Sequence, residues 1–233
     1  MTEPIESASC PPDVEVLRRL IFGRATCRAY RAQQVPQDVV RSIVDVARGT
    51  ASWCNVQPWD LVIASGHSTD AFRNALTEHV EQHPGNDSDI AFPEEYRGVH
   101  LDRRRRAGFQ LYEALGIERG DRERRESQSF ENFRLFGAPH VAIVTIPQEL
   151  GTYGAVDAGG FVWSFLLAAQ AHGVATTPQA ALAMHSKFIR GYFDIPDERR
   201  MVCGISFGYA DEAHPVNSYR TNRAAVDEIA RFA

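Results

Sequence analysis

The chain has 233 residues, of which 44% are hydrophobic, and its formal net charge of −5 gives a sequence pI near 5.9. These values exclude a largely disordered chain and argue against a nucleic-acid partner, because binding to the phosphate backbone calls for a basic surplus. The first residues have neither a basic region nor an apolar run, and no later window is typical of a membrane helix. We therefore expect a cytoplasmic protein without a membrane partner.

The length predicts a single domain over 1–233, with a polar and helical excursion at about 84–137. Its four cysteines lack a metal-type C-x-x-C spacing, so we expect reduced thiols and no metal site. Hydrophobic spacing and β-branched runs predict the regular elements along the chain. The expected helices cover 13–22, 36–49, 71–80, 101–115 and 186–192, and the expected strands cover 60–64, 139–146 and 201–209.

The excursion is rich in arginine, with Arg103 to Arg106 in one helix and a mixed-sign run over 119–125 that predicts the start of another helix reaching Phe133 and Phe136. Such charges usually form a solvated helix face. The alternative is that some of them line an entrance for a substrate or for NAD(P)H, since a local positive field attracts anions.

The stretch 157–172 is apolar on every side of a helical wheel, which predicts a central helix covered all round. Asp157 is expected to cap its first turn and Gly173 to close its end. Three tryptophans, Trp53, Trp59 and Trp163, are expected in the core because of their apolar size. The small-residue stretch 174–182 follows as a loop in which Pro178 fixes the backbone near a binding site.

Two arginine pairs indicate an anion site. Arg24 and Arg28 lie four residues apart around the hydroxyl of Thr26, and Arg220 and Arg223 form a second pair near the C-terminus. Guanidinium groups from two segments suit one shared phosphate. Taken alone, each arginine would more often be a surface or salt-bridged side chain.

Two amides, Asn55 and Gln57, lie in a loop with Trp53, Pro58 and Trp59. An amide donates and accepts at once, as an edge of carbonyls and ring nitrogens requires. The alternative is that both amides cap their own loop.

With these motifs in place, the chain resembles the FMN-dependent nitroreductase family, in particular its nitrobenzoate-reductase-like branch. The resemblance rests on four motifs in the same order, which extend over nearly the whole chain: 24–30 (RATCRAY), 55–59 (NVQPW), 177–181 (TPQAA) and 217–223 (NSYRTNR). It implies an α+β fold with a mostly antiparallel sheet flanked by helices around a buried central helix. It also implies an intertwined homodimer with two FMN molecules at the subunit interface.

The resemblance further implies the flavin contacts. Arg24, Thr26 and Arg223 would hold the phosphate, and Arg28 would reach the ribityl chain and the pyrimidine edge. Asn55 would bond the same edge, with Gln57 contributing across the dimer or not at all. The cofactor-binding residues implied in this way are Arg24, Ala25, Thr26, Arg28, Asn55, Gln57, Pro178, Gln179, Ala180, Ala181, Arg220 and Arg223.

The segment Pro178 to Ala181 would pass over one flavin face, with a backbone N–H near Ala180 or Ala181 donating to flavin N5. A main-chain donor there leaves the opposite face free for substrate. The chain departs from many relatives at Ala25, where a second arginine is common, and at Ala180, where an acidic residue is common. With both side chains lost, the flavin contacts there depend on the backbone, the side-chain redox tuning of those relatives is not expected, and the substrate pocket is expected to be more apolar.

The activity implied is that of an NAD(P)H-dependent FMN oxidoreductase with a ping-pong hydride-transfer cycle, in which NADH or NADPH reduces the flavin and a nitroaromatic, quinone or similar small-molecule acceptor reoxidises it. Tyr112, Phe133 and Phe136 are candidate walls of the substrate pocket. One alternative is a flavin-dependent dehydrogenase, oxidase or dehalogenase of a pathway intermediate. Another is a non-catalytic flavin-binding regulatory protein.

Overall fold

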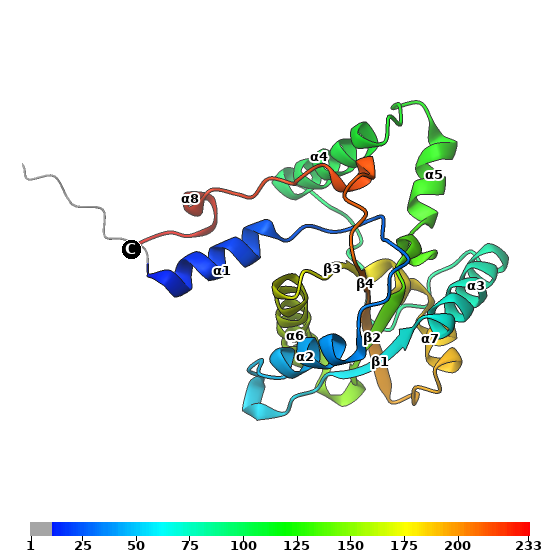
Figure 1. The fold of residues 1–233 in the computed structure, drawn as a ribbon, viewed down its shortest axis with the longest axis horizontal. Coiled ribbons are helices and arrows are strands. Elements are labelled where there is room, and N and C mark those ends of the chain that lie inside the picture. The colour runs from blue at the N-terminus through cyan, green and yellow to red at the C-terminus, as the bar shows by residue number, and fades with distance from the viewer. Residues whose placement is uncertain (1–10) are drawn as a thin grey trace, which may run out of the picture.

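A four-stranded antiparallel sheet forms the middle layer of the molecule (Figure 1). The structure is a computed structural model that describes residues 11–233, so Cys10 lies outside the described residues. The three strands expected from the sequence are confirmed to within two residues at each end. The strands, in the spatial order β1-β2-β4-β3, are β1 (Asp60–Ser65), β2 (His140–Pro147), β4 (Arg199–Gly208) and β3 (Ala175–Gln179).

The stretch expected as a loop around Pro178 is instead the edge strand β3, so this prediction was wrong. β3 pairs only with β4, where Pro178 lies opposite Ile205. An edge strand leaves one side of its backbone free, which is where a proline without an N–H is tolerated. The short helix η4 (Ala180–His185) follows at once, and its Leu182 packs so closely on β4 that a Cβ at Gly204 would lie 2.3 Å from Leu182 Cδ1.

Helices cover both faces of the sheet. On one face α2 and α6 pack together and enclose the larger core with buried residues such as Ile43, Phe161 and Phe207. On the other face α3 and α7 enclose a second core that includes Phe72 and Ile189. Figure 1 shows these pairs on opposite sides of the strands. The helices are α2 (Gln37–Ala47), α6 (Gly151–Ala171), α3 (His67–Gln82) and α7 (Ser186–Tyr192).

The central helix α6 begins at Gly151, six residues before Asp157, so Asp157 does not cap its first turn. Its carboxylate instead accepts a hydrogen bond from the Trp53 N–H, with Oδ2 3.1 Å from the nitrogen. The expectation that α6 is covered all round is also wrong for the single chain. Tyr153, Val156 and Trp163 form an exposed stripe, with exposed fractions of 60%, 62% and 50%.

The three tryptophans also differ in their burial. Trp59 is half-buried and stacks on Phe161, with ring centroids 5.0 Å apart. Trp53 is 56% exposed and meets Tyr153 edge to face, so it lies beside the exposed stripe of α6. The core prediction therefore fails for Trp53 and Trp163, because their large apolar surfaces face away from the body of this chain.

The excursion is built from α4 and α5, which lie together at one end of the molecule (Figure 1). α5 ends at Phe130 and does not reach Phe133 or Phe136 as expected. Leu135 and Phe136 have φ values of 56° and 52°, which a continuing right-handed helix does not permit. The bounds are α4 (Gly98–Ala114) and α5 (Arg122–Phe130), followed by the short helix η2 (Leu135–Gly137).

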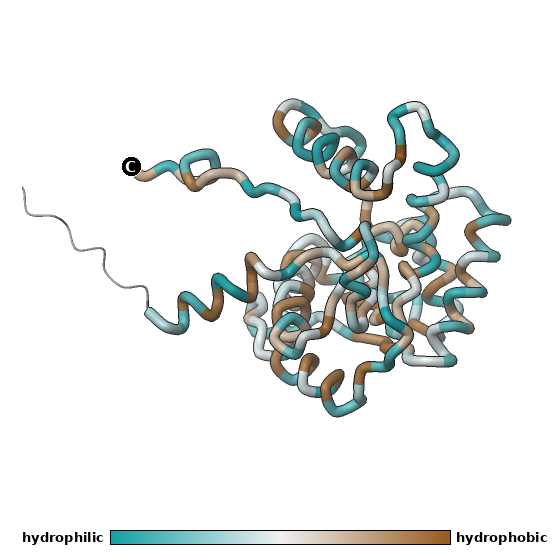
Figure 2. Tube along the Cα trace, turned by 45° about the horizontal axis from the view of Figure 1, so that its top comes forward, coloured by the Kyte–Doolittle hydropathy of each residue, from teal (hydrophilic) through white to brown (hydrophobic). Residues whose placement is uncertain are grey.

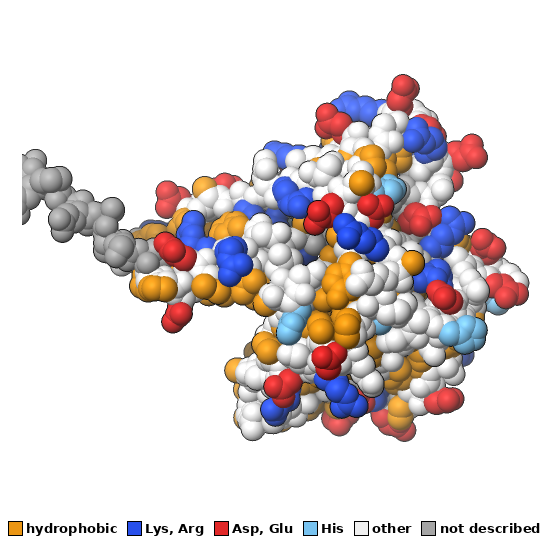
Figure 3. All heavy atoms as spheres, viewed as in Figure 1, with side chains coloured by type: hydrophobic (Ala, Val, Ile, Leu, Met, Phe, Trp, Pro, Cys, Tyr) orange, Lys and Arg blue, Asp and Glu red, His pale blue; other side chains and the backbone are white. Residues whose placement is uncertain are grey.

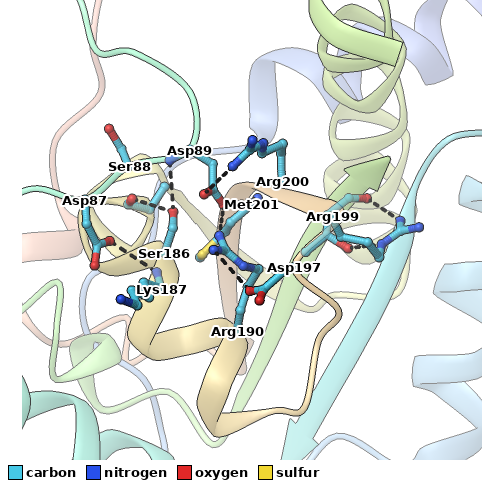
Figure 4. Close-up of polar contacts among 12 residues, drawn as sticks. Asp87, Ser88, Asp89, Ser186, Lys187, Arg190, Asp197, Arg199, Arg200 and Met201 are labelled. Carbon is cyan, nitrogen blue, oxygen red and sulfur yellow. Dashed lines mark hydrogen bonds and ion pairs between the residues drawn. The ribbon is translucent and has the colours of Figure 1, made fainter. Parts of the chain in front are cut away.

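A buried ion-pair network fixes the start of the excursion to the core (Figure 4). The Asp89 side chain is 4% exposed and pairs with the guanidinium of Arg190 on α7. It also accepts from the Met201 N–H at 2.8 Å and lies 3.4 Å from Arg200 Nη1. Because a carboxylate buried in this way requires several donors, the network fixes where the chain leaves the sheet layer.

The two ends of the described chain extend away from the body as arms. α1 (Pro12–Gly23) has no buried residue, and α8 (Val226–Ile229) is equally exposed. Figure 2 shows apolar residues alternating with polar ones along α1, and Figure 3 shows hydrophobic side chains on its surface. None of the described helices combines the length and apolar character needed to cross a membrane. The remaining short helices are η1 (Trp53–Asn55), η3 (Gln148–Leu150) and η5 (Pro215–Asn217).

Candidate functional site

The segment 24–30 links α1 to the body and runs beside β3. Thr26 forms an isolated parallel bridge with Thr176, and the Cys27 N–H donates to the Thr176 carbonyl at 3.2 Å. Thr177 Oγ1 in turn donates to the Cys27 carbonyl and lies 2.7 Å from the Tyr30 hydroxyl. These bonds place Thr26 at the edge of the sheet, with Ala25 half-buried beside it.

Arg24 has the donors of an anion site. Its Nε and Nη1 atoms are buried and have no hydrogen-bond partner among the described residues. Its Cζ lies 5.3 Å from the centroid of the Trp163 ring on the exposed stripe of α6. Burial lowers the pKa of Arg24, and the positive charge of Arg223 lowers it further. A half-buried cation with two unsatisfied donors, close enough to a second arginine for its charge to act, favours a bound anion.

Arg28 is held from the C-terminal segment. Its Nη1 donates to the Tyr219 hydroxyl at 2.8 Å, and its backbone N–H donates to Asn217 Oδ1 at 2.8 Å. Asn217 Nδ2 donates to the carbonyls of Ala29 and Asp211, both at 2.9 Å. Asn217 and Tyr219 lie in the motif 217–223, but their residue types alone did not indicate these contacts with Arg28. For Asn217 a signal was present, because an asparagine next to a turn commonly bonds nearby backbone. No such signal was present for Tyr219.

The second arginine pair is split by the structure. Arg220 folds back on its own segment, where Nη1 donates to the carbonyls of Asn217 and Tyr219 at 2.8 and 2.9 Å. Among the described residues Arg223 also donates only to its own segment, to Thr221 and Asn222, and its positive charge contributes to the lowered pKa of Arg24. Arg220 thus supports the turn, and Arg223 acts on Arg24 through its charge.

The end of β3 presents backbone rather than side chains. Gln179 is 2% exposed, and its amide is turned inward, where Nε2 donates to the Asn132 carbonyl at 2.8 Å. Its Oε1 accepts from the Ser206 hydroxyl at 2.5 Å. Ala180 is exposed and Ala181 is half-buried. The Gln179 side chain is therefore not available to a ligand, and Ala180 is the exposed residue at this strand end.

A cavity of about 210 Å³ separates the strand end from the excursion. Tyr112 from α4 and Phe136 line it, and the Arg28 Cζ lies 6.0 Å from the Phe136 ring centroid. Phe133, the third candidate pocket wall, does not line this cavity and packs edge to face with His185. The full lining consists of Thr26, Arg28, Leu111, Tyr112, Gln128, Ser129, Asn132, Phe136, Thr177 and Pro178.

Asn55 and Gln57 lie far from these residues in the single chain. Figure 1 shows the segment around η1 at the opposite end of α6 from the segment 24–28. Both amides are exposed, with φ values of 56° and 47°, and Gln57 Nε2 donates to the Asn55 carbonyl at 3.2 Å. Within one chain they therefore behave as loop amides.

The buried cysteines and the Tyr30 hydroxyl keep their protons at neutral pH. Burial raises the pKa of Cys203 to about 12, and it also raises the pKa of Cys27. Burial likewise holds the pKa of the Tyr30 hydroxyl well above its usual range. Within residues 11–233, no three His, Cys, Asp or Glu side chains gather in a metal-binding arrangement.

The four-stranded antiparallel sheet, the helices on both of its faces and the arginines beside its edge strand define the class: an α+β protein with a candidate anion site at the sheet edge. The chain belongs to the nitroreductase family, whose family model matches residues 21–209. It is 36% identical over 223 residues to the nitroreductase NfnB of Mycolicibacterium smegmatis, covering 94% of this chain and 93% of that protein. It is 31% identical to a 4-nitrobenzoate reductase of Nocardioides sp., covering 95% of this chain and 91% of that protein.

A solved structure supports the fold. The crystal structure of the FMN-dependent nitroreductase NfnB from Mycobacterium smegmatis in complex with NADPH superposes with a TM-score of 0.90 at 34% identity. The match covers 94% of this chain and 99% of that one. The expected fold, a mostly antiparallel sheet flanked by helices around a central helix, is therefore confirmed.

Proposed function

We propose that the protein is an FMN-dependent oxidoreductase that uses NADPH or NADH to reduce nitroaromatic acceptors, with quinones as further acceptors. The observation that carries this proposal is the half-buried Arg24, whose Nε and Nη1 lack hydrogen-bond partners within residues 11–233 and which feels the charge of Arg223. The relatives support the class of reaction, since one is named a nitroreductase and another a 4-nitrobenzoate reductase.

The residues present fit FMN. Arg24, Thr26 and Arg223 would hold the phosphate, because a dianion satisfies several charge-assisted donors at once. Arg28 would meet the ribityl chain and the pyrimidine edge of the ring, and the backbone from Pro178 to Ala181 would lie along one ring face. When bound, FMN would supply the two-electron chemistry that links the nicotinamide to the acceptor.

The residues of this chain position the arginines and the backbone around the ligand, and they do not transfer protons. Asn217 and Tyr219 set Arg28 in place before a ligand arrives, and the buried Gln179 amide fixes the backbone of the strand end. The Tyr30 hydroxyl keeps its proton at neutral pH because burial raises its pKa. Protons for the reduced acceptor therefore come from solvent.

We further propose that two copies pair across the exposed stripe of α6. Tyr153, Val156 and Trp163 are apolar, exposed and on one face of an otherwise buried helix. α1 carries a similar unburied apolar face, with Leu17 and Phe22 49% and 66% exposed. A second copy would cover both surfaces, as expected for an intertwined homodimer.

Such a dimer would also complete the flavin site. The stripe from Tyr153 to Trp163 runs along roughly 15 Å of helix, with Arg24 over Trp163 and the Asn55 loop beside Tyr153. A two-fold axis perpendicular to α6 that passes through the stripe would exchange its ends. Asn55 of the partner subunit would then meet the arginines of the first chain, and FMN would lie at the interface.

The test begins with the visible spectrum of purified protein and chromatography of the chromophore released on heating. We expect FMN, rapid bleaching by NADPH or NADH under anaerobic conditions, and recovery of colour with 4-nitrobenzoate. Bound FMN that neither nicotinamide bleaches would favour the oxidase or the regulatory alternative. A protein that takes up no FMN would refute the proposal. Sedimentation should give twice the chain mass of 26.0 kDa.

A further inference from the structure

The excursion contains a second cavity that the proposed function does not use. It has a volume of about 280 Å³ and lies along α5. It shares Tyr112 and Ser129 with the first cavity, so the two adjoin. Its lining consists of Tyr112, Arg122, Arg125, Glu126, Ser129, Phe130 and Phe133.

Arg125 is the main cation of this cavity. Its Cζ lies 5.0 Å from the centroid of the Tyr112 ring, and its Nη2 donates to the Glu118 carbonyl at 3.0 Å. Its Nε is buried without a hydrogen-bond partner among residues 11–233, and no carboxylate lies within ion-pair distance of it there. A half-buried guanidinium with a free donor is suited to an anion that supplies the missing acceptor.

Arg122 is the second cation, one turn earlier on the same side of α5. It pairs with Glu126, with Nε 2.7 Å from Oε1. The two side chains are 89% and 65% exposed, so this pair contributes little and a dianion can displace it. Two guanidinium groups against one carboxylate leave the cavity positively charged.

The rest of the lining suits a planar base. Phe130 and Phe133 meet edge to face with ring centroids 5.7 Å apart, and Tyr112 also lines the cavity. Aromatic side chains of this kind stack on nucleobases. The cavity thus combines a phosphate site with a site for an aromatic base, and its volume suits one end of a dinucleotide rather than the whole molecule.

NADPH differs from NADH only by a phosphomonoester on the ribose beside the adenine. We propose that the cavity along α5 binds this 2′-phosphoadenosine end, with Arg125 and Arg122 as the residues that select NADPH over NADH. The inference rests on the proposed function, because it places the reductant across both cavities. It assigns reductant choice to the excursion and not to the arginines that would hold FMN.

The test compares kcat/KM for NADPH and NADH, with 4-nitrobenzoate fixed, in wild-type protein, Arg125→Ala and Arg122→Ala. We expect the wild-type protein to prefer NADPH at least tenfold. Charge-assisted hydrogen bonds contribute about 1.5–3 kcal/mol, so Arg125→Ala should lower kcat/KM for NADPH by about tenfold to 150-fold. The loss should lie in KM, since the phosphate is remote from the reacting atoms, and the NADH values should stay within about twofold.

Arg119→Ala is the matched control, because Arg119 lies outside the cavity with its Cζ 4.8 Å from the Phe109 ring centroid. A second readout needs no turnover: calorimetric binding of adenosine 2′-monophosphate, compared with adenosine 5′-monophosphate. We expect the 2′-isomer to bind at least tenfold more tightly and Arg125→Ala to abolish the difference. Equal binding of the isomers, equal use of NADH and NADPH, or an unchanged preference in Arg125→Ala would each overturn the inference.

Different results would refute the proposed function and the assignment of the reductant site. If the protein contains FMN and both nicotinamides bleach it equally, the reductant site is wrong but the proposed function stands. If neither nicotinamide bleaches bound FMN, the proposed function itself is wrong.

Discussion

Replacing Arg24 with methionine should separate a ligand-binding role from a structural one. The side chain is half-buried, and its Nε and Nη1 have no partner among the described residues. If both atoms donate to the FMN phosphate, each charge-assisted bond contributes about 1.5–3 kcal/mol. Losing two such bonds should weaken FMN binding by roughly 10²-fold to 10⁴-fold.

Without FMN, the Arg24→Met substitution should leave the free energy of unfolding unchanged or raise it. Arg24→Met removes two unsatisfied buried donors, each of which costs about 1–3 kcal/mol. It also removes a cation–π contact with Trp163, which contributes roughly 0.5–2 kcal/mol. Methionine keeps the apolar contact with the ring. The free energy of unfolding without FMN should therefore stay within about 1 kcal/mol of wild type, or rise.

The assay is a titration of flavin-free protein with FMN, followed by quenching of flavin fluorescence, together with urea unfolding with and without FMN. Arg31→Met is the control, because Arg31 lies on the same segment with an exposed side chain. Unchanged FMN affinity in Arg24→Met would refute the phosphate assignment. A loss of several kcal/mol in the flavin-free protein would show that Arg24 stabilises the fold instead.

Three further predictions test the surroundings of the site. Asp89→Ala leaves the buried Arg190 guanidinium without its main partner, so the free energy of unfolding should fall by about 3–5 kcal/mol in urea titrations. Asn217→Ala removes three hydrogen bonds, to the backbone of Arg28, Ala29 and Asp211, and fluorescence titration should show about tenfold weaker FMN binding. His185→Phe should reduce the loss of stability between pH 7.5 and pH 5, measured by thermal unfolding at each pH.

The sign of the pH effect follows from the pKa shift of the buried imidazole. Burial, and then the charge of His79, lowers the pKa of His185 in the folded state. The unfolded chain therefore binds more protons as pH falls below about 6.5, which lowers the stability of the folded state. Phenylalanine cannot titrate and keeps the edge-to-face contact with Phe133. A stability loss on acidification equal to that of wild type would contradict this reasoning.

Each of the three substitutions, at Asp89, Asn217 and His185, has a control variant. The double variant Asp89→Ala/Arg190→Met should recover part of the stability that Asp89→Ala loses, because no buried charge remains unpaired. Ser218→Ala, next to Asn217 and exposed, should leave FMN affinity unchanged. The exposed His100→Phe should leave the pH dependence as in wild type.

The sequence alone determined the elements whose signals are local. The helix expected over 186–192 forms as α7 with the same bounds, and the β-branched runs form β2 and β4. The arginines of the expected phosphate site could be named from the sequence, because a guanidinium carries its charge and donors wherever the chain folds, and their role stays a prediction. In the structure the charge of Arg223 lowers the pKa of Arg24, although the two residues are almost 200 positions apart.

Only the tertiary structure decided which face of each element is covered. Pro178 looked like a loop residue, yet it lies in an edge strand because β4 supplies all the pairing that β3 needs. Gln179 turns its amide inward because Asn132 and Ser206 satisfy it there. Trp163 is apolar but 50% exposed, and the contact described on its ring is with the Arg24 guanidinium. These outcomes depend on contacts between residues distant in sequence, which local patterns do not encode.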